Sequence, residues 1–178
     1  MNRVFLGGSR KMSRLNEPIR ARLAEIVRRR MQILVGDANG ADRAMQQQLA
    51  EWRYPHVEVY FVGSAPRNNE GAWPAHRIPT PPGVRGFDFY SVKDRAMADA
   101  AECGIMLWDG ESRGTLANVE NLANAGKPVT VYVGPRRRFV NVRSALDLGA
   151  LLGVGEPIQA TRPASAELQT ALVLPADG

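Results

Sequence analysis

The sequence predicts a three-layer α/β fold of Rossmann-like type. In this fold a doubly wound, mostly parallel sheet of about five strands is covered by helices on both faces. Two observations predict it. Short apolar runs alternate along the chain with segments of helical periodicity. The 178 residues are 44% hydrophobic and 23% charged, which is typical of a globular domain with a substantial core.

Each predicted strand is a short apolar run that is followed by glycine or polar residues. These runs are 3–6, 33–35, 57–62, 104–108 and 128–133. A continuous apolar run of this length is consistent with a strand buried inside a sheet. The glycines after the first two runs, at Gly7-Gly8 and Gly36, interrupt the pattern and indicate turns.

The predicted helices lie between these strands, at 16–30, 41–52, 91–102 and 115–125, with a last one at 144–152. In the first of them Ile19, Leu23 and Ile26 fall on one face. Pro18 suits its first turn, where no backbone N–H is needed. Strands and helices of these lengths, in alternation, predict right-handed crossovers and ligands at the carboxyl ends of the strands.

We expect one domain over residues 1–155, with a long irregular insertion at 63–90 and a partly mobile tail at 156–178. The insertion contains Pro66, Pro74, Pro79, Pro81 and Pro82, which exclude regular structure over much of it.

The aromatic residues in and beside the insertion have two interpretations. These residues are Trp73, Phe87, Phe89 and Tyr90. They could form a lid in which one ring stacks on a base while Arg67, Arg77 or Arg85 meets phosphate. Alternatively, they bury the insertion against the body of the domain.

The charge of the chain favours anionic ligands. With 23 Lys and Arg against 18 Asp and Glu, the formal charge is +5, which suits phosphates or nucleic acid without choosing between them.

The single cysteine, Cys103, excludes an internal disulfide framework and suits a reducing cytoplasm. Because no apolar run is long enough for a membrane span or a secretory signal, we expect a cytoplasmic protein without a membrane partner. His56 and His76 lack metal-ligand spacing, so neither a metal nor a cofactor is expected.

Three strand-to-helix junctions carry the candidate binding residues. The first junction contains Gly7, Gly8, Ser9 and Arg10. The second junction contains Gly36, Asp37, Asn39, Gly40 and Asp42. The third junction contains Asp109, Ser112, Gly114 and Thr115. Glycines let backbone N–H groups approach an anion, and hydroxyl, guanidinium and helix N-terminal donors add to them. For Asp42, in a first helical turn, two roles stay open: a partner of the helix dipole or a ligand of a ribose hydroxyl.

Taken in order, these junctions resemble a known family. Gly8-Ser9-Arg10, Gly-Asp-Ala-Asn-Gly-Ala-Asp-Arg at 36–43, Trp-Asp-Gly-Glu-Ser-Arg-Gly-Thr at 108–115 and Gly-Lys-Pro-Val at 126–129 are similar to the YspA/YpsA-related branch of the SLOG superfamily. That superfamily groups Rossmann-like domains related to the DNA-processing protein DprA and to the LOG, or lysine decarboxylase-like, proteins. The resemblance covers roughly residues 3–133. It implies a pocket for a nucleotide derivative at the three junctions, used for sensing or for cleavage.

The LOG proteins cut the N-glycosidic bond of a nucleoside monophosphate, and their motif has an arginine four residues before a methionine, followed by Pro-Gly-Gly-x-Gly-Thr-x-x-Glu. The resemblance places Lys93 at the arginine position and Asn118 at the glutamate position. Lysine can hold a phosphate, whereas asparagine cannot replace the carboxylate in catalysis. Asp109 is the first candidate to replace it. The further candidates are Asp37, Asp94 and Glu120.

The main hypothesis is therefore the binding or sensing of a nucleotide or nucleotide-sugar derivative, of adenosine phosphate or ADP-ribose type, at the carboxyl edge of the sheet. An alternative is a nucleoside 5'-monophosphate N-glycosidase, or a deoxyribosyltransferase-like enzyme, with Asp109 and Lys93 as catalytic residues. A third hypothesis is DprA-like nucleic-acid binding. It is less favoured because the basic groups Arg28–Arg30 and Arg136–Arg138 lie on an outer helix and a late loop. A homo-oligomer such as a dimer stays open.

Overall fold

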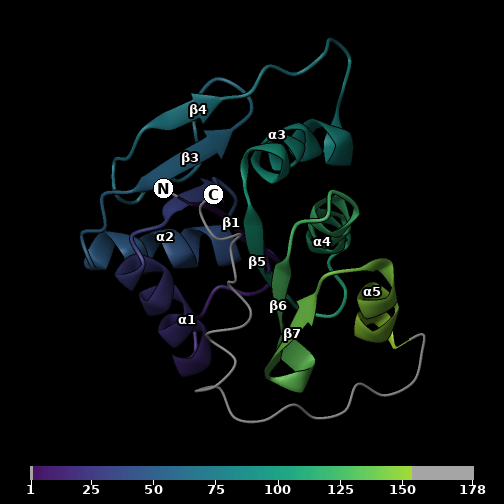
Figure 1. Cartoon of the computed structure of the whole chain (residues 1–178). Coiled ribbons are helices and arrows are strands. Elements are labelled where there is room, and N and C mark those ends of the chain that lie inside the picture. Colours follow the sequence, from purple (N-terminus) through teal and green to yellow (C-terminus); the bar gives the residue numbers. More distant parts are fainter. Residues whose placement is uncertain (1, 154–178) are drawn as a thin grey trace, which may run out of the picture.

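The computed structural model describes residues 2–153 and confirms the three-layer α/β fold (Figure 1). Its single sheet has seven strands in the order β4-β3-β2-β1-β5-β6-β7, rather than about five. All neighbouring strands are parallel except β6 and β7, which are antiparallel. The strands are β1 (Arg3–Gly8), β2 (Gln32–Gly36), β3 (Val57–Phe61), β4 (Ala75–Arg77), β5 (Cys103–Trp108), β6 (Val129–Val133) and β7 (Arg138–Val142).

Helices cover both faces of the sheet, and Figure 1 shows α1 and α2 on one side and α3, α4 and α5 on the other. The helices are α1 (Glu17–Arg28), α2 (Ala41–Glu51), α3 (Gly86–Ala100), α4 (Arg113–Asn124) and α5 (Ala145–Leu152), with a short 3₁₀ turn, η1 (Gly134–Arg136). Each face has its own apolar core. Leu23 of α1 and Met45 of α2 pack on one face, whereas Met97 of α3 and Leu122 of α4 pack on the other.

Side-chain caps fix the beginning of several helices. The Ile19 amide donates to Oδ1 of Asn16 at 3.2 Å, and the Thr115 amide donates to Oγ of Ser112 at 3.3 Å. Such caps satisfy N–H groups that have no partner within the helix. They place the starts of α1 and α4 within two residues of the starts expected from the sequence.

The insertion is more regular than its prolines predict. It contains β4, and α3 begins at Gly86 rather than at residue 91. An edge strand needs hydrogen bonds on one side only, so β4 can lie between prolines: the carbonyl of Pro74 accepts from the Val59 amide at 2.9 Å. Arg85, at the cap position of α3, makes no side-chain cap bond, so the sequence contains no start signal there.

Strand β7 is also absent from the strands that the sequence predicts, because it is not an apolar run. Its residues alternate, with Val140 and Val142 buried and Arg138 and Asn141 exposed. That pattern is typical of an antiparallel edge strand with one covered face.

The tail expected at 156–178 lies outside the described residues. Within residues 2–153, no helix has both the length and the apolar character needed to span a membrane.

Candidate functional site

A cavity of about 690 Å³ lies at the carboxyl edge of the sheet, beside the ends of β1 and β5. From β1 the chain continues outward to β2 on one side, and from β5 it continues to β6 on the other. Neighbouring loops therefore leave the sheet towards opposite faces at this point and open a crevice between them. This is the position at which doubly wound sheets bind ligands.

The first and third junctions are joined to each other through Asp109. Its Oδ2 accepts a hydrogen bond of 2.6 Å from the hydroxyl of Ser9, and its Oδ1 accepts from the amides of Glu111 and Ser112 at 3.0 and 2.7 Å. Burial acts to raise the pKa of Asp109, but these hydrogen bonds lower it below its ordinary value. The carboxylate is thus ionised and holds the two loops in place beside the cavity.

Backbone donors lie at the cavity on both of these loops. Arg10 and Gly114 line it, and in the part of the chain that the structure describes their N–H groups have no protein acceptor. Gly114 is in the first turn of α4, where N–H groups and the helix dipole favour an anion. Together the two loops provide the kind of donors that a phosphate requires.

The floor of the cavity contains a charged and polar cluster, which we call the floor cluster: Asp42, Lys93, Asp94 and Asn118. Asp94 is partly exposed and the other three residues are buried. Lys93 is only 3% exposed, and its Nζ lies 2.6 Å from Oδ1 of Asp94. Asn118 donates from Nδ2 to Oδ2 of Asp94 at 3.4 Å. The two positions matched to the LOG motif, 93 and 118, are thus brought together by Asp94.

The carboxyls of the floor cluster set its charge. Burial raises the pKa of Asp42 to about 7, against the opposing effect of Lys93. Burial acts to lower the pKa of Lys93, but Asp94 and Asp42 raise it above its ordinary value. Lys93 is therefore a cation neutralised by its own neighbours, which makes it a poor attractor for a phosphate.

The rim of the cavity carries cations and aromatic rings. The guanidinium carbons of Arg10 and Arg67 lie 5.2 and 4.7 Å from the centroid of the Tyr90 ring. The exposed Phe87 lies above Gly114, where an added Cβ would be 3.7 Å from its ring. Lys11 pairs with Glu111 at 2.6 Å across the same opening. The rim is thus more cationic than the floor.

The second junction contributes little to the cavity, because its polar groups bind the insertion instead. The buried carboxylate of Asp37 accepts from the amide, Nε and Nη2 of Arg67 at 3.0, 3.0 and 2.7 Å. Burial acts to raise the pKa of Asp37, but Arg67 lowers it below the ordinary value. Asn39 accepts through Oδ1 from Asn68 at 3.0 Å. Of this junction only Ala38 and Asp42 line the cavity.

The two glycines of the second junction make room for other groups. A Cβ on Gly36 would lie 2.5 Å from Oδ2 of Asp42 and 2.8 Å from Nζ of Lys93, so the floor cluster occupies that space. Gly40 has a φ of +82°, and a Cβ there would lie 2.2 Å from the carbonyl oxygen of Arg10. The next amide, that of Ala41, donates to the carbonyl of Ser9 at 3.1 Å. The start of α2 is therefore fixed against the first junction, and the Ala41 amide is not available to a ligand.

The structure divides the sequence-predicted site residues into two groups. Those that line the cavity are Gly7, Gly8, Ser9, Arg10, Asp42, Lys93, Asp109, Ser112, Gly114, Thr115 and Asn118. Those that do not are Gly36, Asp37, Asn39 and Gly40. Their roles in binding or catalysis stay predictions.

Sequence reasoning gave too little weight to three lining residues, Lys11, Arg67 and Asp94. Asp94 had a signal, because it follows Lys93 within a predicted helix. The sequence indicates Arg67 only as part of a lid, and it gives no signal for Lys11 beyond its place after Arg10. The described residues contain no group of three or more His, Cys, Asp and Glu side chains arranged to hold a metal ion.

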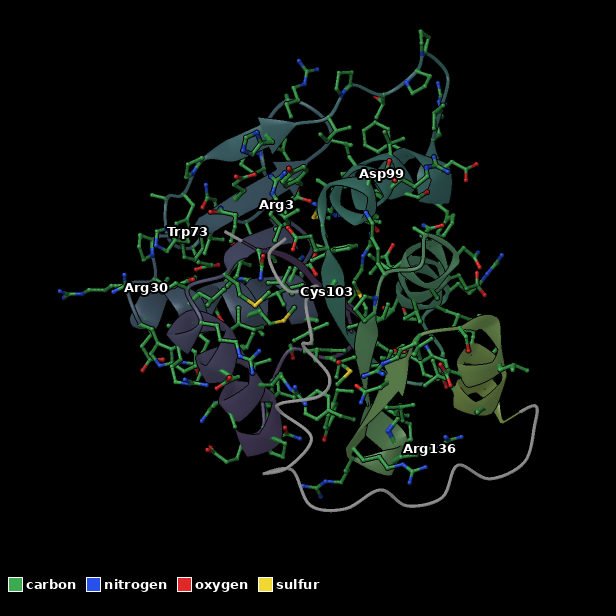
Figure 2. All side chains as sticks on the ribbon, viewed as in Figure 1. Arg3, Arg30, Trp73, Asp99, Cys103 and Arg136 are labelled. Atoms are coloured by element: carbon green, nitrogen blue, oxygen red, sulfur yellow. The ribbon has the colours of Figure 1, made fainter. Side chains whose placement is uncertain are left out.

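The lid interpretation does not hold for Trp73. Its ring is buried in the core beside α1 and α2, and its Nε1 donates to the carbonyl of Tyr54 at 2.8 Å. Figure 2 shows Trp73 between the beginning of β3 and α2. Trp73 therefore attaches the insertion to the body of the domain. Of the insertion's aromatic residues, Phe87 and Tyr90 line the cavity.

The two basic groups lie at different places, as the labelled Arg30 and Arg136 in Figure 2 show. Arg28 and Arg29 end α1 at the opposite edge of the sheet from the cavity, and both pair with Glu25. The other group, Arg136–Arg138, follows β6 and is exposed. It lies at the carboxyl edge, because Gly134 is beside Asp109, with an added Cβ 3.7 Å from Cα of that residue.

No protein-family model matches the chain, and no curated protein matches it. Among solved structures, the chain is similar to DNA processing protein A from Helicobacter pylori, which was solved for its single-stranded DNA binding mode. The TM-score is 0.57 at 16% identity, over 87% of this chain and 74% of that one. A likeness at this identity concerns the fold. The chain thus shares the Rossmann-like fold of DNA processing protein A, while its place in the YspA/YpsA-related branch stays a prediction.

Proposed function

We propose that the cavity binds a phosphorylated nucleoside or nucleotide sugar, with the phosphate at the rim and the sugar towards the floor. One observation carries the proposal: cationic side chains and backbone donors surround the opening, whereas buried hydrogen-bond acceptors lie beneath it. A cavity of about 690 Å³ is in the range of small-molecule sites.

Arg10 is the residue best suited to meet the phosphate. It is exposed, contacts the face of Tyr90 and, within residues 2–153, takes part in no ion pair. Arg67 also lines the cavity, but Asp37 already neutralises it. A guanidinium binds a phosphate in a bidentate manner and is favoured over an ammonium for this purpose. The amide of Gly114 would complete the phosphate site from the opposite loop.

In this proposal Asp109 is a positioning residue. Its two oxygens accept hydrogen bonds from Ser9, Glu111 and Ser112, so it has little remaining capacity for a reacting group. An N-glycosidase reaction, the alternative hypothesis, would have to use another carboxylate. Asp94, which lies in the floor cluster between Lys93 and Asn118, is the candidate in the right place.

Single-stranded DNA binding is the second candidate function. Two observations favour it: the fold likeness to DNA processing protein A, and the exposed cations at the carboxyl edge, which include Lys11 and Arg136–Arg138. Cations in such a position would contact successive phosphates of a strand. A nucleotide unit of the strand could then enter the same cavity.

Isothermal titration of the full chain with AMP, ADP-ribose, inorganic phosphate and a short oligo(dT) tests both functions. We expect AMP or ADP-ribose to bind more tightly than inorganic phosphate, and Arg10→Ala to weaken this binding by about tenfold or more. Arg28→Ala, which removes a cation at the other edge, is the matched control and should bind as the wild type does.

Other results of these titrations would favour a different function. Binding of oligo(dT) alone, with a steep dependence on salt, would replace the first function by the second. Release of free base from AMP would instead identify the N-glycosidase alternative. If none of the four ligands binds, both proposed functions are wrong.

A further inference from the structure

We infer that the floor cluster recognises the vicinal hydroxyl groups of a ribose and thereby discriminates against 2-deoxyribose. This inference rests on the proposed function, since it concerns the sugar of the same ligand. The juxtaposition that carries it is the pair of carboxyl groups of Asp42 and Asp94, which lie on α2 and α3 and line one cavity beside Lys93.

The floor cluster is unsuited to a phosphate. Asp94 contacts Nζ of Lys93 at 2.6 Å and neutralises it, and the carboxyl of Asp42 adds further acceptor atoms. A phosphate placed there would meet two carboxyls for one ammonium. The anionic end of a ligand is therefore directed to the rim, where Arg10 and the amide of Gly114 lie.

The floor cluster has acceptor capacity that the protein does not use. Among the described residues, the Asp42 carboxyl accepts only one long hydrogen bond, from the Ala38 amide to Oδ2 at 3.3 Å. Asp94 accepts from Lys93 at 2.6 Å and from Asn118 at only 3.4 Å. A carboxylate has about four lone-pair positions, so each of these groups can accept again from a ligand.

Hydroxyl groups are the donors that fit this arrangement. A hydroxyl donates to a carboxylate in a short, charge-assisted hydrogen bond and carries no charge that would disturb the balance around Lys93. Asp42 and Lys93 are immediate neighbours, because a Cβ on Gly36 would contact both at 2.5 and 2.8 Å. Two carboxyls beside one ammonium match two adjacent hydroxyls, such as the 2'- and 3'-hydroxyls of a ribonucleotide.

The test compares ligands that differ only in the 2'-hydroxyl. Titration calorimetry of the wild-type full chain is performed with ribose 5-phosphate against 2-deoxyribose 5-phosphate, and with AMP against dAMP. Because the phosphate is common to each pair, interactions at the rim cancel in the ratio of affinities. We expect the ribose compound to bind about tenfold to a hundredfold more tightly in both pairs, as loss of one hydrogen bond to a charged group predicts.

The possible results separate this inference from the proposed function. Equal affinities within both pairs would overturn the inference while leaving nucleotide binding intact. If none of the four compounds binds, the proposed function itself fails. Tighter binding of the deoxy compounds would also overturn the inference, and it would favour the DNA-binding candidate.

Variants assign the discrimination to the floor cluster. Asp94→Asn keeps the size of the side chain and should reduce the ratio of the affinities for the ribose and deoxyribose compounds to near one. Glu111→Gln removes a carboxylate from the rim and should leave the ratio unchanged. If circular dichroism shows that Asp94→Asn does not fold, Asp42→Asn gives the same readout. If Asp94→Asn or Asp42→Asn folds and still prefers ribose over deoxyribose by the wild-type ratio of affinities, the floor cluster does not cause the discrimination.

Discussion

The hydroxyl of Ser9 donates a hydrogen bond of 2.6 Å to Oδ2 of Asp109, although the two residues are 100 positions apart in the chain. This bond joins the loop after β1 to the loop after β5, at the point where the chain leaves these two neighbouring strands towards opposite faces of the sheet. Both loops line the cavity, so the shape of the cavity depends on a contact that lies outside any strand or helix.

Asp109→Ala should destabilise the protein. The substitution removes the acceptor for the Ser9 hydroxyl and for the amides of Glu111 and Ser112. We expect the free energy of unfolding in urea to fall by about 1–3 kcal/mol, because donors are left without partners. Glu111→Gln in the same loop changes an exposed side chain and should have little effect. Equal stability of Asp109→Ala and the wild type would contradict the joining role of Asp109.

Asp42 should make the stability of the protein depend on pH between about 4 and 7. The pKa of Asp42 rises from 3.8 to about 7 on folding, so in this range the folded chain binds a proton that the unfolded chain does not. Raising the pH therefore favours the unfolded chain. We expect the wild type, compared with Asp42→Asn, to lose roughly 2–4 kcal/mol of unfolding free energy from pH 4 to pH 7.

The comparison with Asp42→Asn is needed because other carboxyl groups make the stability of the protein change with pH in the opposite direction. The carboxyls of Asp37 and Asp109 have lowered pKa values, so their stabilisation is present above pH 3.8 and is lost as the pH falls below it. These contributions are common to both proteins and cancel in the difference. If the difference in unfolding free energy between the wild type and Asp42→Asn stays constant from pH 4 to pH 7, Asp42 is ionised throughout this range.

Gly40→Ala should destabilise the protein more than an alanine substitution at another glycine with positive φ. At Gly40 the new Cβ would lie 2.2 Å from the carbonyl oxygen of Arg10, in addition to the strain at a φ of +82°. We expect a loss of about 2–4 kcal/mol of unfolding free energy, together with weaker AMP binding, because the first junction must move.

Gly126→Ala provides the matched control for this prediction. Gly126 has a φ of +70°, but nothing lies within 4 Å of an added Cβ. Only the backbone strain remains, so we expect the free energy of unfolding to fall by about 1 kcal/mol and AMP binding to be unaffected. If the two variants unfold at the same urea concentration, the contact between Gly40 and Arg10 carries no energetic weight.

Tyr90 should support binding through its ring and not through its hydroxyl. Arg10 and Arg67 both contact the face of this ring, which holds their guanidinium groups at the rim. Tyr90→Ala should weaken ribose 5-phosphate binding by about twofold to thirtyfold, as loss of about 0.5–2 kcal/mol implies. Tyr90→Phe keeps the ring and should bind as the wild type does in the same titration. A large effect of Tyr90→Phe would instead indicate a role for the hydroxyl.

The sequence by itself determined the strands that are buried on both faces and the helices between them. β1, β2, β3, β5 and β6 are apolar runs, and the helices are bounded by caps such as Asn16 and Ser112. These features are local, since they depend on hydrophobic periodicity and on side chains that bond to nearby backbone. Parallel pairing then placed the junctions at one edge of the sheet. The edge strands β4 and β7 were missed because a strand covered on one face, or paired on one side, need not be an apolar run.

Only the tertiary structure decided which polar groups face the cavity. Asp37 and Asp42 lie in the same junction, yet the first binds Arg67 of the insertion and the second lines the cavity. Lys93 and Asn118 meet through Asp94 because α3 and α4 pack side by side with these positions facing each other. Such choices depend on contacts between residues far apart in the chain. No local pattern encodes them, because the direction of a side chain is fixed by the packing of the element that carries it.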